Sequence, residues 1–128
     1  MTITFDPHWT YRGFRALTLE NRYLRAVILA ERGGKFWSLI DKTADREILW
    51  HNPRVPPRPV AYGAAYDDWF CGGWDELFPN DAPAIINGDA YPDHGELWSM
   101  PYEWRADGAS HEISLRLNRD GIATATQV

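Results

Sequence analysis

The first half of the sequence is a succession of short β-rich segments separated by turn signals, and this pattern limits the fold more than any other feature. The predicted strands span residues 14–20, 23–30, 35–41 and 46–50. Gly33-Gly34 and residues 41–45 supply turns between consecutive strands. No segment has a convincing apolar period of 3.6 residues, so helices should be scarce and the strands should form an antiparallel meander. The fold class that we expect is all-β.

Two further strands are predicted near the end of the sequence. Apolar and polar side chains alternate within residues 110–118, which is typical of a half-buried strand. Its apolar face consists of Ile113, Leu115 and Leu117. Asp120-Gly121 indicates a turn, and residues 122–128 begin another β-rich run. A sheet that finishes on such a run exposes an edge strand, so we expect this edge to offer a homodimer interface.

Length and composition fit a single domain over residues 1–128. Of these 128 residues 45% are hydrophobic and 24% are charged, as in globular proteins. Two domains of ordinary size would need a longer chain. Residues 51–59 contain four prolines within seven positions. They leave too few N–H donors for a central strand, so we expect an extended connection there.

The charges are distributed unevenly along the chain. Residues 1–58 carry ten lysines and arginines against six acidic residues, whereas residues 59–104 carry nine acidic residues and no basic one. Nucleic-acid binding requires the opposite, a basic face that replaces phosphate counterions. The acidic part would also repel phosphorylated sugars unless arginines of the first half fold over it. We therefore expect neutral sugars or cations as ligands, and no nucleic acid.

Cysteine usage and the apolar segments indicate the compartment. Cys71 is the only cysteine, which excludes an intramolecular disulfide and favours a reducing compartment. The first residues have neither the basic nor the apolar region of a signal peptide. No apolar stretch is long enough for a membrane span. The sequence predicts a soluble, cytoplasmic protein without a membrane partner.

Acidic, aromatic and glycine residues concentrate within 28 positions in the middle of the chain. Two motifs make up this region: Cys71-Gly72-Gly73-Trp74-Asp75-Glu76-Leu77-Phe78-Pro79-Asn80 and Pro92-Asp93-His94-Gly95-Glu96-Leu97-Trp98. Their carboxylates, histidine and large aromatics are the side chains that a site uses to grip an uncharged polyhydroxy ligand and to move protons on it.

Together the two motifs resemble the galactose mutarotase-like (aldose epimerase) superfamily. Residues 33–41 and 49–53 are also similar to that family's opening hairpins, so the resemblance runs from about residue 20 to residue 105. It implies a large antiparallel β-sandwich, of which this chain matches the N-terminal portion, with a sugar bound in a cleft across one sheet. The family's enzymes interconvert the α and β anomers of free aldoses without a metal or an organic cofactor.

The resemblance assigns the ring-oxygen contact to His94, which stands at the position of the family's motif histidine. Opening a pyranose ring needs an acid at the ring oxygen and a base at the C1 hydroxyl, and histidine suits the acid role near neutral pH. The family's base is a glutamate from later in a longer chain, and a second histidine of its site also has no counterpart here. Either Asp75, Glu76 or Glu96 replaces that base, or the chain binds a sugar without turning it over.

Trp74 and Trp98 offer flat apolar surfaces on which the C–H groups of a neutral monosaccharide can stack. Large aromatics more often belong to a core, however, and the alternative stays open for both. Trp37 and Trp50 lie on predicted strands, and we assign them to the core.

Each polar candidate also has a purely structural interpretation. His94 could bond a turn, and Asp75 and Glu76 could bond backbone N–H groups beside the glycines. If these segments are extended, the neighbours Asp75 and Glu76 point to opposite faces. By the same rule His94 and Glu96 would share one face.

Two further classes of protein remain as alternatives. Gly88, His94 and Glu96 partly match the first metal-binding motif of the cupin barrels. Zinc, iron or manganese would then be held by His94, Glu96 and a further histidine, His51 or His111. No second cupin motif follows. A non-catalytic carbohydrate-binding module needs only the aromatic and acidic cleft.

Overall fold

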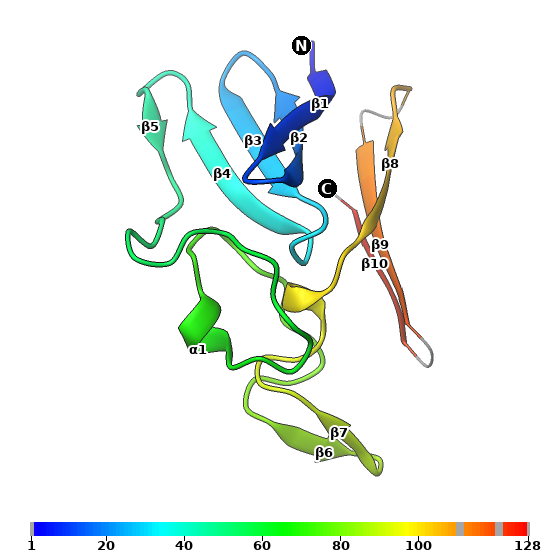
Figure 1. The fold of residues 1–128 in the computed structure, drawn as a ribbon. Coiled ribbons are helices and arrows are strands. Elements are labelled where there is room, and N and C mark those ends of the chain that lie inside the picture. The colour runs from blue at the N-terminus through cyan, green and yellow to red at the C-terminus, as the bar shows by residue number, and fades with distance from the viewer. Residues whose placement is uncertain (1, 110–111, 120–121, 128) are drawn as a thin grey trace.

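The computed structural model describes residues 2–109, 112–119 and 122–127, and most of its regular structure is antiparallel β-sheet (Figure 1). A five-stranded sheet contains, in spatial order, β1 (Thr4–Tyr11), β2 (Phe14–Glu20), β3 (Leu24–Leu29), β4 (Lys35–Asp41) and β5 (Arg46–Glu47). A three-stranded sheet contains, in spatial order, β10 (Ile122–Gln127), β9 (Glu112–Arg119) and β8 (Glu103–Asp107). The other elements of the described chain are β6 (Ala84–Ile86), β7 (Asp89–Tyr91), the helix α1 (Tyr66–Trp69) and the 3-10 turn η1 (Leu97–Ser99). The predicted all-β class is confirmed.

Most predicted strands are confirmed, and the differences lie at sheet edges. β2 and β4 coincide with their predicted segments, and β3 lies within its own. β5 is shorter than predicted, because the chain leaves the ladder after Glu47. β1 has no predicted counterpart, since Asp6 and Pro7 interrupt its β-rich pattern. As an edge strand it accommodates Pro7 at a register shift between Asp6 and Trp9.

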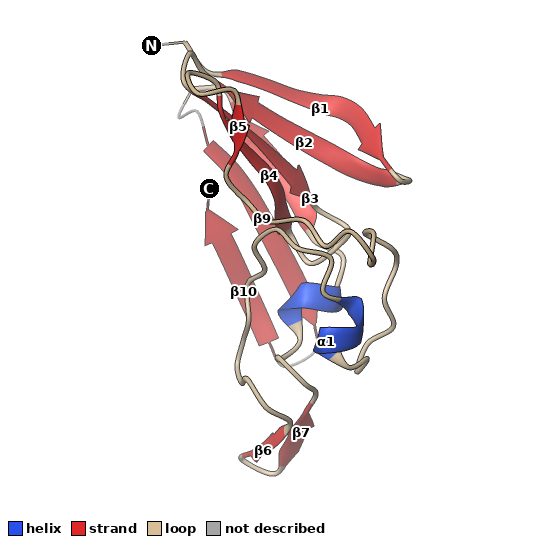
Figure 2. Ribbon diagram, turned by 90° about the vertical axis from the view of Figure 1, so that its left-hand side faces the viewer, coloured by secondary structure: helices blue, strands red, loops and turns tan. Residues whose placement is uncertain are grey.

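The main core lies between the two sheets. Leu17 and Ile28, which are fully buried on the five-stranded sheet, belong to one cluster with Ile113, Leu115 and Leu117 of β9. The predicted inner face of that strand is therefore confirmed. Figures 1 and 2 show β9 and β10 lying alongside the five-stranded sheet as a second layer, which gives a sandwich-like arrangement.

A second cluster lies on the other face of the five-stranded sheet. It contains Phe14, Ala16, Leu29, Trp37 and Cys71. The core assignment of Trp37 is confirmed, but that of Trp50 is wrong, because its side chain is 59% exposed. β5 ends three residues before Trp50, which lies instead in the connection and stacks on Phe70 with ring centroids 6.0 Å apart.

The middle of the chain is mostly loop, as predicted. Residues 52–59 form no strand, and residues 60–104 contain only short elements. In both views the β6–β7 hairpin projects away from the two sheets (Figures 1 and 2). The predicted turn at Asp120-Gly121 lies outside the described residues, as does His111. Within the described chain, no helix has the length and apolar character required to cross a membrane.

Candidate functional site

The two motifs meet in space because the turn at His94 and Gly95 is pinned to the segment that precedes the β6–β7 hairpin. The backbone N–H of Glu96 donates to the carbonyl oxygen of Phe78 over 2.8 Å, and that of His94 donates to Asp81 over 2.5 Å. Gly95 has a φ of 75°, and a Cβ there would lie 2.1 Å from the Phe78 carbonyl oxygen. Only glycine fits so close an approach. This contact fixes where the His94 side chain begins.

The imidazole of His94 lies between two carboxylates. Its Nδ1 is 2.8 Å from Oδ1 of Asp93, and its Nε2 is 3.3 Å from Oδ1 of Asp81. The His94 side chain is 22% exposed and that of Asp81 is 88% exposed, so solvent reaches the imidazole on the Asp81 side. With Nδ1 held by Asp93, Nε2 is the nitrogen that faces Asp81 and the solvent-exposed side of the cluster.

Tyr66, the first residue of α1, holds the same histidine from a second direction. Its ring lies against the imidazole, with centroids 4.1 Å apart and planes inclined by 14°. Its backbone N–H donates to Oδ2 of Asp93 over 2.8 Å. That hydrogen bond and the one from His94 lower the pKa of the Asp93 carboxyl, which therefore stays ionised. Asp93 thus joins the tyrosine backbone to the imidazole.

A buried ion pair holds the hydroxyl end of Tyr66. The phenol O–H of Tyr66 donates to Oδ2 of Asp75 over 2.9 Å, and Nζ of Lys35 lies 2.8 Å from the same oxygen. Both charged side chains are almost completely buried, and Lys35 also donates to the carbonyl oxygen of Gly72 over 2.5 Å. Burial, followed by the charge of Asp75, raises the pKa of Tyr66, which stays a neutral hydrogen-bond donor.

A second buried cation braces the segment that follows His94. Arg32 donates from Nη1 to the carbonyl oxygen of Trp98 over 2.5 Å and from Nε to that of Arg58 over 3.1 Å. Its guanidinium also lies over the Trp98 ring, 5.1 Å from the centroid. Basic residues of the first half therefore do fold into the acidic segment. Arg32 and Lys35 are buried there and bonded to neighbouring groups, so their charges are not accessible to a ligand from solution.

The two tryptophans predicted to contact a sugar have opposite environments. Trp74 is 60% exposed, and its backbone N–H and C=O both pair with Phe36 of β4. Trp98 is almost fully buried in η1, where its ring lies perpendicular to that of Tyr66 with centroids 5.0 Å apart. Trp74 therefore presents a surface to solvent, whereas Trp98 supports the histidine cluster from within the fold.

The three carboxylates considered as replacement bases are also separated. Asp75 is paired with Lys35, Glu76 is exposed, and Glu96 is buried with Oε1 accepting a hydrogen bond from the Tyr62 hydroxyl over 2.7 Å. The expectation that Glu96 shares a face with the preceding histidine does not hold. Alternation of faces requires an extended chain, and the left-handed turn that separates the two residues is not extended.

The sequence interpretation did not assign Asp81, Asp93 or Tyr66 to the site. The adjacency of Asp93 to the motif histidine was a signal that could have indicated an orienting carboxylate. Tyr66 and Asp81 carry no comparable signal, because only the folded loops bring them to the imidazole. Among the described residues, no group of three or more His, Cys, Asp or Glu side chains is arranged to hold a metal ion. The structure therefore adds no support to the cupin-like alternative.

The fold and this cluster define the chain as an antiparallel, sandwich-like β protein with a carboxylate-oriented histidine on its loop side. No protein-family model matches the sequence. Among solved structures the chain is similar to HI1317, known from a crystal structure analysis, with a TM-score of 0.56 and 18% sequence identity. The match covers 96% of this chain and 45% of HI1317, so the chain spans less than half the length of that structure. At this identity the likeness is one of fold.

Proposed function

We propose that this chain is a carbohydrate-binding protein of the galactose mutarotase-like type, in which His94 contacts the ring oxygen of a neutral monosaccharide. The observation that carries the proposal is the hydrogen-bonded pair of Asp93 and His94. A carboxylate on Nδ1 fixes the orientation of the ring and leaves Nε2 directed to the accessible side. That is the arrangement expected of a histidine that gives a proton to a ligand and takes it back.

The proposed reaction is the interconversion of the anomers of a free aldose. A base removes the proton of the C1 hydroxyl, the bond between C1 and the ring oxygen breaks, and its electron pair goes to that oxygen. The Nε2–H of His94, whose Nδ1–H stays bonded to Asp93, protonates the oxygen, which gives the open-chain aldehyde and a free hydroxyl. Rotation about the adjacent carbon–carbon bond and the reverse steps close the ring as the other anomer. No metal or organic cofactor takes part.

Asp81 is the carboxylate that we propose as the base within this chain. The C1 hydroxyl and the ring oxygen are bonded to the same carbon, so the acid and the base must approach neighbouring atoms. Oδ1 of Asp81 lies 3.3 Å from Nε2 of His94, and its side chain is open to solvent. Of the other candidates, Asp75 and Glu96 are buried, whereas Glu76 is exposed and could bind sugar hydroxyls beside Trp74.

A non-catalytic carbohydrate-binding module is the second candidate. It is favoured by the state of two of the carboxylates considered as bases, since Asp75 is paired with Lys35 and Glu96 is buried. In that case the His94 cluster and the exposed Trp74 bind the sugar, and the anomers interconvert at their spontaneous rate.

Polarimetry on freshly dissolved α-glucose and α-galactose tests the proposal. We expect faster equilibration with the protein present, and loss of that acceleration in His94→Asn and Asp81→Asn. Asparagine is the suitable replacement for His94, because the residue has a φ of 59° and asparagine tolerates this conformation. Asp89→Asn, on the neighbouring hairpin strand β7, is the matched control and should retain full acceleration.

Saturation-transfer NMR with the same sugars separates the two candidates. Transfer to the sugar without acceleration of equilibration would establish the binding module. If neither signal appears with any common aldose, the proposal is overturned.

We further propose that the protein forms a homodimer through the edge of the three-stranded sheet. β10 pairs with β9 on one side only among the described residues, so its other edge can accept a strand. Light scattering should give twice the mass of the chain, and a strictly monomeric mass would refute this arrangement.

We also infer a reducing compartment, such as the cytoplasm. The single Cys71 is fully buried, and burial raises the pKa of its thiol, so it is protected as a free thiol. Localisation of a tagged protein by cell fractionation tests this inference.

A further inference from the structure

A groove crosses the face of the five-stranded sheet that is turned away from the three-stranded sheet. Its volume is about 560 Å³, within the range of about 300–1,000 Å³ that is typical of ligand pockets. Residues paired across strands form its floor: Thr4, Glu20 and Arg25 in one row, Asp6, Thr18 and Val27 in the next. None of the residues that line the groove belongs to the His94 cluster. The groove is therefore a separate candidate site.

One end of the groove is aromatic and already ordered. Trp9 is 66% exposed, and its indole Nε1 donates to Oδ2 of Asp6 over 3.1 Å, which holds the ring in one orientation. Beside it Tyr11 stacks on Trp37, with centroids 5.5 Å apart and planes inclined by 27°. Because these rings are already held in place, a ligand that stacks on them does not have to order them first, and the entropic cost of binding is smaller.

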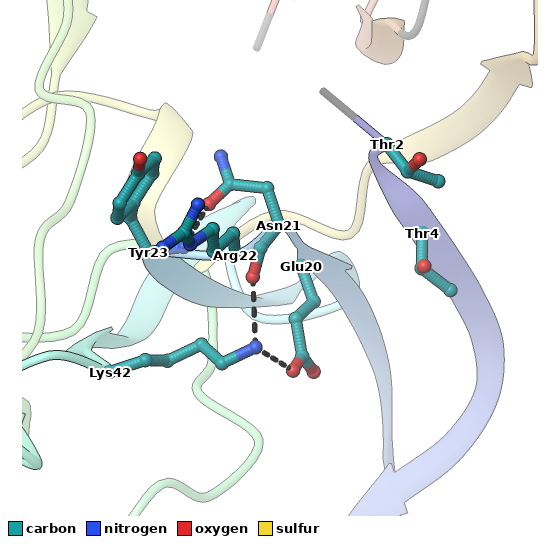
Figure 3. Close-up of a pocket in the computed structure, with 7 residues that line it drawn as sticks. All are labelled: Thr2, Thr4, Glu20, Asn21, Arg22, Tyr23 and Lys42. Carbon is teal, nitrogen blue, oxygen red and sulfur yellow. Dashed lines mark hydrogen bonds and ion pairs between the residues drawn. The ribbon is translucent and has the colours of Figure 1, made fainter.

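Arg25 and Glu20, two of the three charged residues that line the groove, are paired with each other, and the third, Asp6, is hydrogen-bonded to the Trp9 indole. Glu20 lies 2.8 Å from Arg25 and 2.5 Å from Lys42. These two partners, Arg25 first, lower the pKa of the Glu20 carboxyl to about 2, so it remains an anion paired with both cations. Figure 3 shows the adjoining cavity, of about 770 Å³, where Lys42 bonds Glu20 and Asn21. Among its described lining residues, the groove therefore offers no unpaired cation to an anionic ligand.

The groups that remain available are neutral hydroxyls. Thr4, Thr10 and Thr18 line the groove, and the structure records no hydrogen bond from their hydroxyls to any described residue. Each hydroxyl can donate one hydrogen bond and accept two. The lining thus combines exposed aromatic faces, unengaged hydroxyls and charged groups that are already paired or hydrogen-bonded.

We propose that this groove is a second binding site, and that its ligand is a neutral saccharide with one sugar ring stacked on Trp9 and its hydroxyls bonded to Thr18 and Thr4. The C–H face of a sugar ring matches an aromatic surface, and its hydroxyls match groups that both donate and accept. A polar sheet face alone would only be hydrated. The exposed, hydrogen-bonded indole at its end is what distinguishes this face from an ordinary solvated one.

The test uses saccharides that cannot open their rings, so that it is independent of the reaction proposed at His94. Methyl α-glucoside, methyl α-galactoside and trehalose are added to ¹⁵N-labelled protein, and the indole N–H signal of Trp9 is followed by NMR. We expect a saturable shift with a dissociation constant in the millimolar range for at least one of them. Trp9→Ala should weaken binding about tenfold, as measured by calorimetry or saturation transfer.

Three comparisons make the outcome decisive. Thr18→Val, which keeps the shape of the side chain, should weaken binding several-fold, whereas Trp50→Ala, an exposed tryptophan outside the groove, should leave it unchanged. His94→Asn should also bind these glycosides at the groove with unchanged affinity, even if it abolishes mutarotation. The proposal is overturned if the Trp9 indole signal does not shift, or if it responds to tetramethylammonium and to none of the saccharides.

Discussion

The imidazole of His94 lies almost parallel to the ring of Tyr66, 4.1 Å away. This stack, together with the bond from the Tyr66 backbone to Asp93, makes one side of the histidine depend on a helix of only four residues. The contributions of the ring stack and of the tyrosine hydroxyl can be measured separately, because different substitutions of Tyr66 remove one or the other.

Replacing Tyr66 tests the stack. In Tyr66→Leu the ring-current shift on the His94 ring protons should disappear, which ¹H NMR measures directly. Tyr66→Phe should preserve that shift and lose only the bond to Asp75, at a cost of about 1 kcal/mol in the free energy of unfolding. An unchanged His94 spectrum in Tyr66→Leu would mean that the two rings are not stacked in solution.

Removing one partner of the buried ion pair of Lys35 and Asp75 should lower the free energy of unfolding more than replacing both partners by apolar residues. Lys35→Met leaves the Asp75 carboxylate buried without its counter-charge and should destabilise the protein by about 3–5 kcal/mol. The double variant Lys35→Met/Asp75→Leu should recover part of that loss. Urea unfolding of the wild type, both single variants and the double variant gives the coupling energy, and additive effects would contradict this account.

Gly95 should not tolerate a side chain, whereas Gly88 should tolerate one at modest cost. Both have a positive φ, 75° and 89°, so alanine strains the backbone at either position. Only at Gly95 would the new Cβ collide with backbone, at 2.1 Å from the Phe78 carbonyl oxygen, while at Gly88 nothing lies within 4 Å. Gly88→Ala should therefore cost about 1 kcal/mol, and Gly95→Ala clearly more. Thermal unfolding of the two variants measures the difference, and equal losses would refute the close approach.

The ion pairs of Glu20 should stabilise the fold at neutral pH and lose that effect in acid. Arg25 and Lys42 lower the pKa of Glu20 in the folded protein from 4.5 to about 2. A lowered folded-state pKa stabilises the fold above the unfolded value, and the effect declines as pH falls from about 4.5 towards 2. The stability difference between wild type and Glu20→Gln should shrink over that range.

Urea midpoints at several pH values measure this effect, with Glu103→Gln on β8 as the control. High salt should also reduce the Glu20 difference, since the pairs are exposed to solvent. A difference that stays constant down to pH 2 would contradict the assignment.

Part of the candidate site could be predicted from sequence because its signal is local. The glycines and His94 lie within short motifs, and the structure brings those motifs together through the Phe78 and Asp81 carbonyl groups. Asp81 and Tyr66 could not be predicted, because they reach His94 only when distant loops fold onto it. Trp98 and Trp74 look alike in sequence, yet one is buried and the other exposed. Burial depends on long-range packing, which the residue type alone does not determine.

The sequence by itself determined the all-β class and most strand positions, because alternation and turn chemistry act between near neighbours in the chain. It also determined the apolar face of β9, since side chains two apart on a strand share a face. Only the tertiary structure decided the roles of the charged residues. Lys35 and Arg32 belong to the basic first half of the sequence, yet both are buried against acidic and carbonyl groups that lie far away in the chain. A buried charge is stable only where the fold supplies a counter-charge or hydrogen-bond acceptors, and these come together only in the tertiary structure.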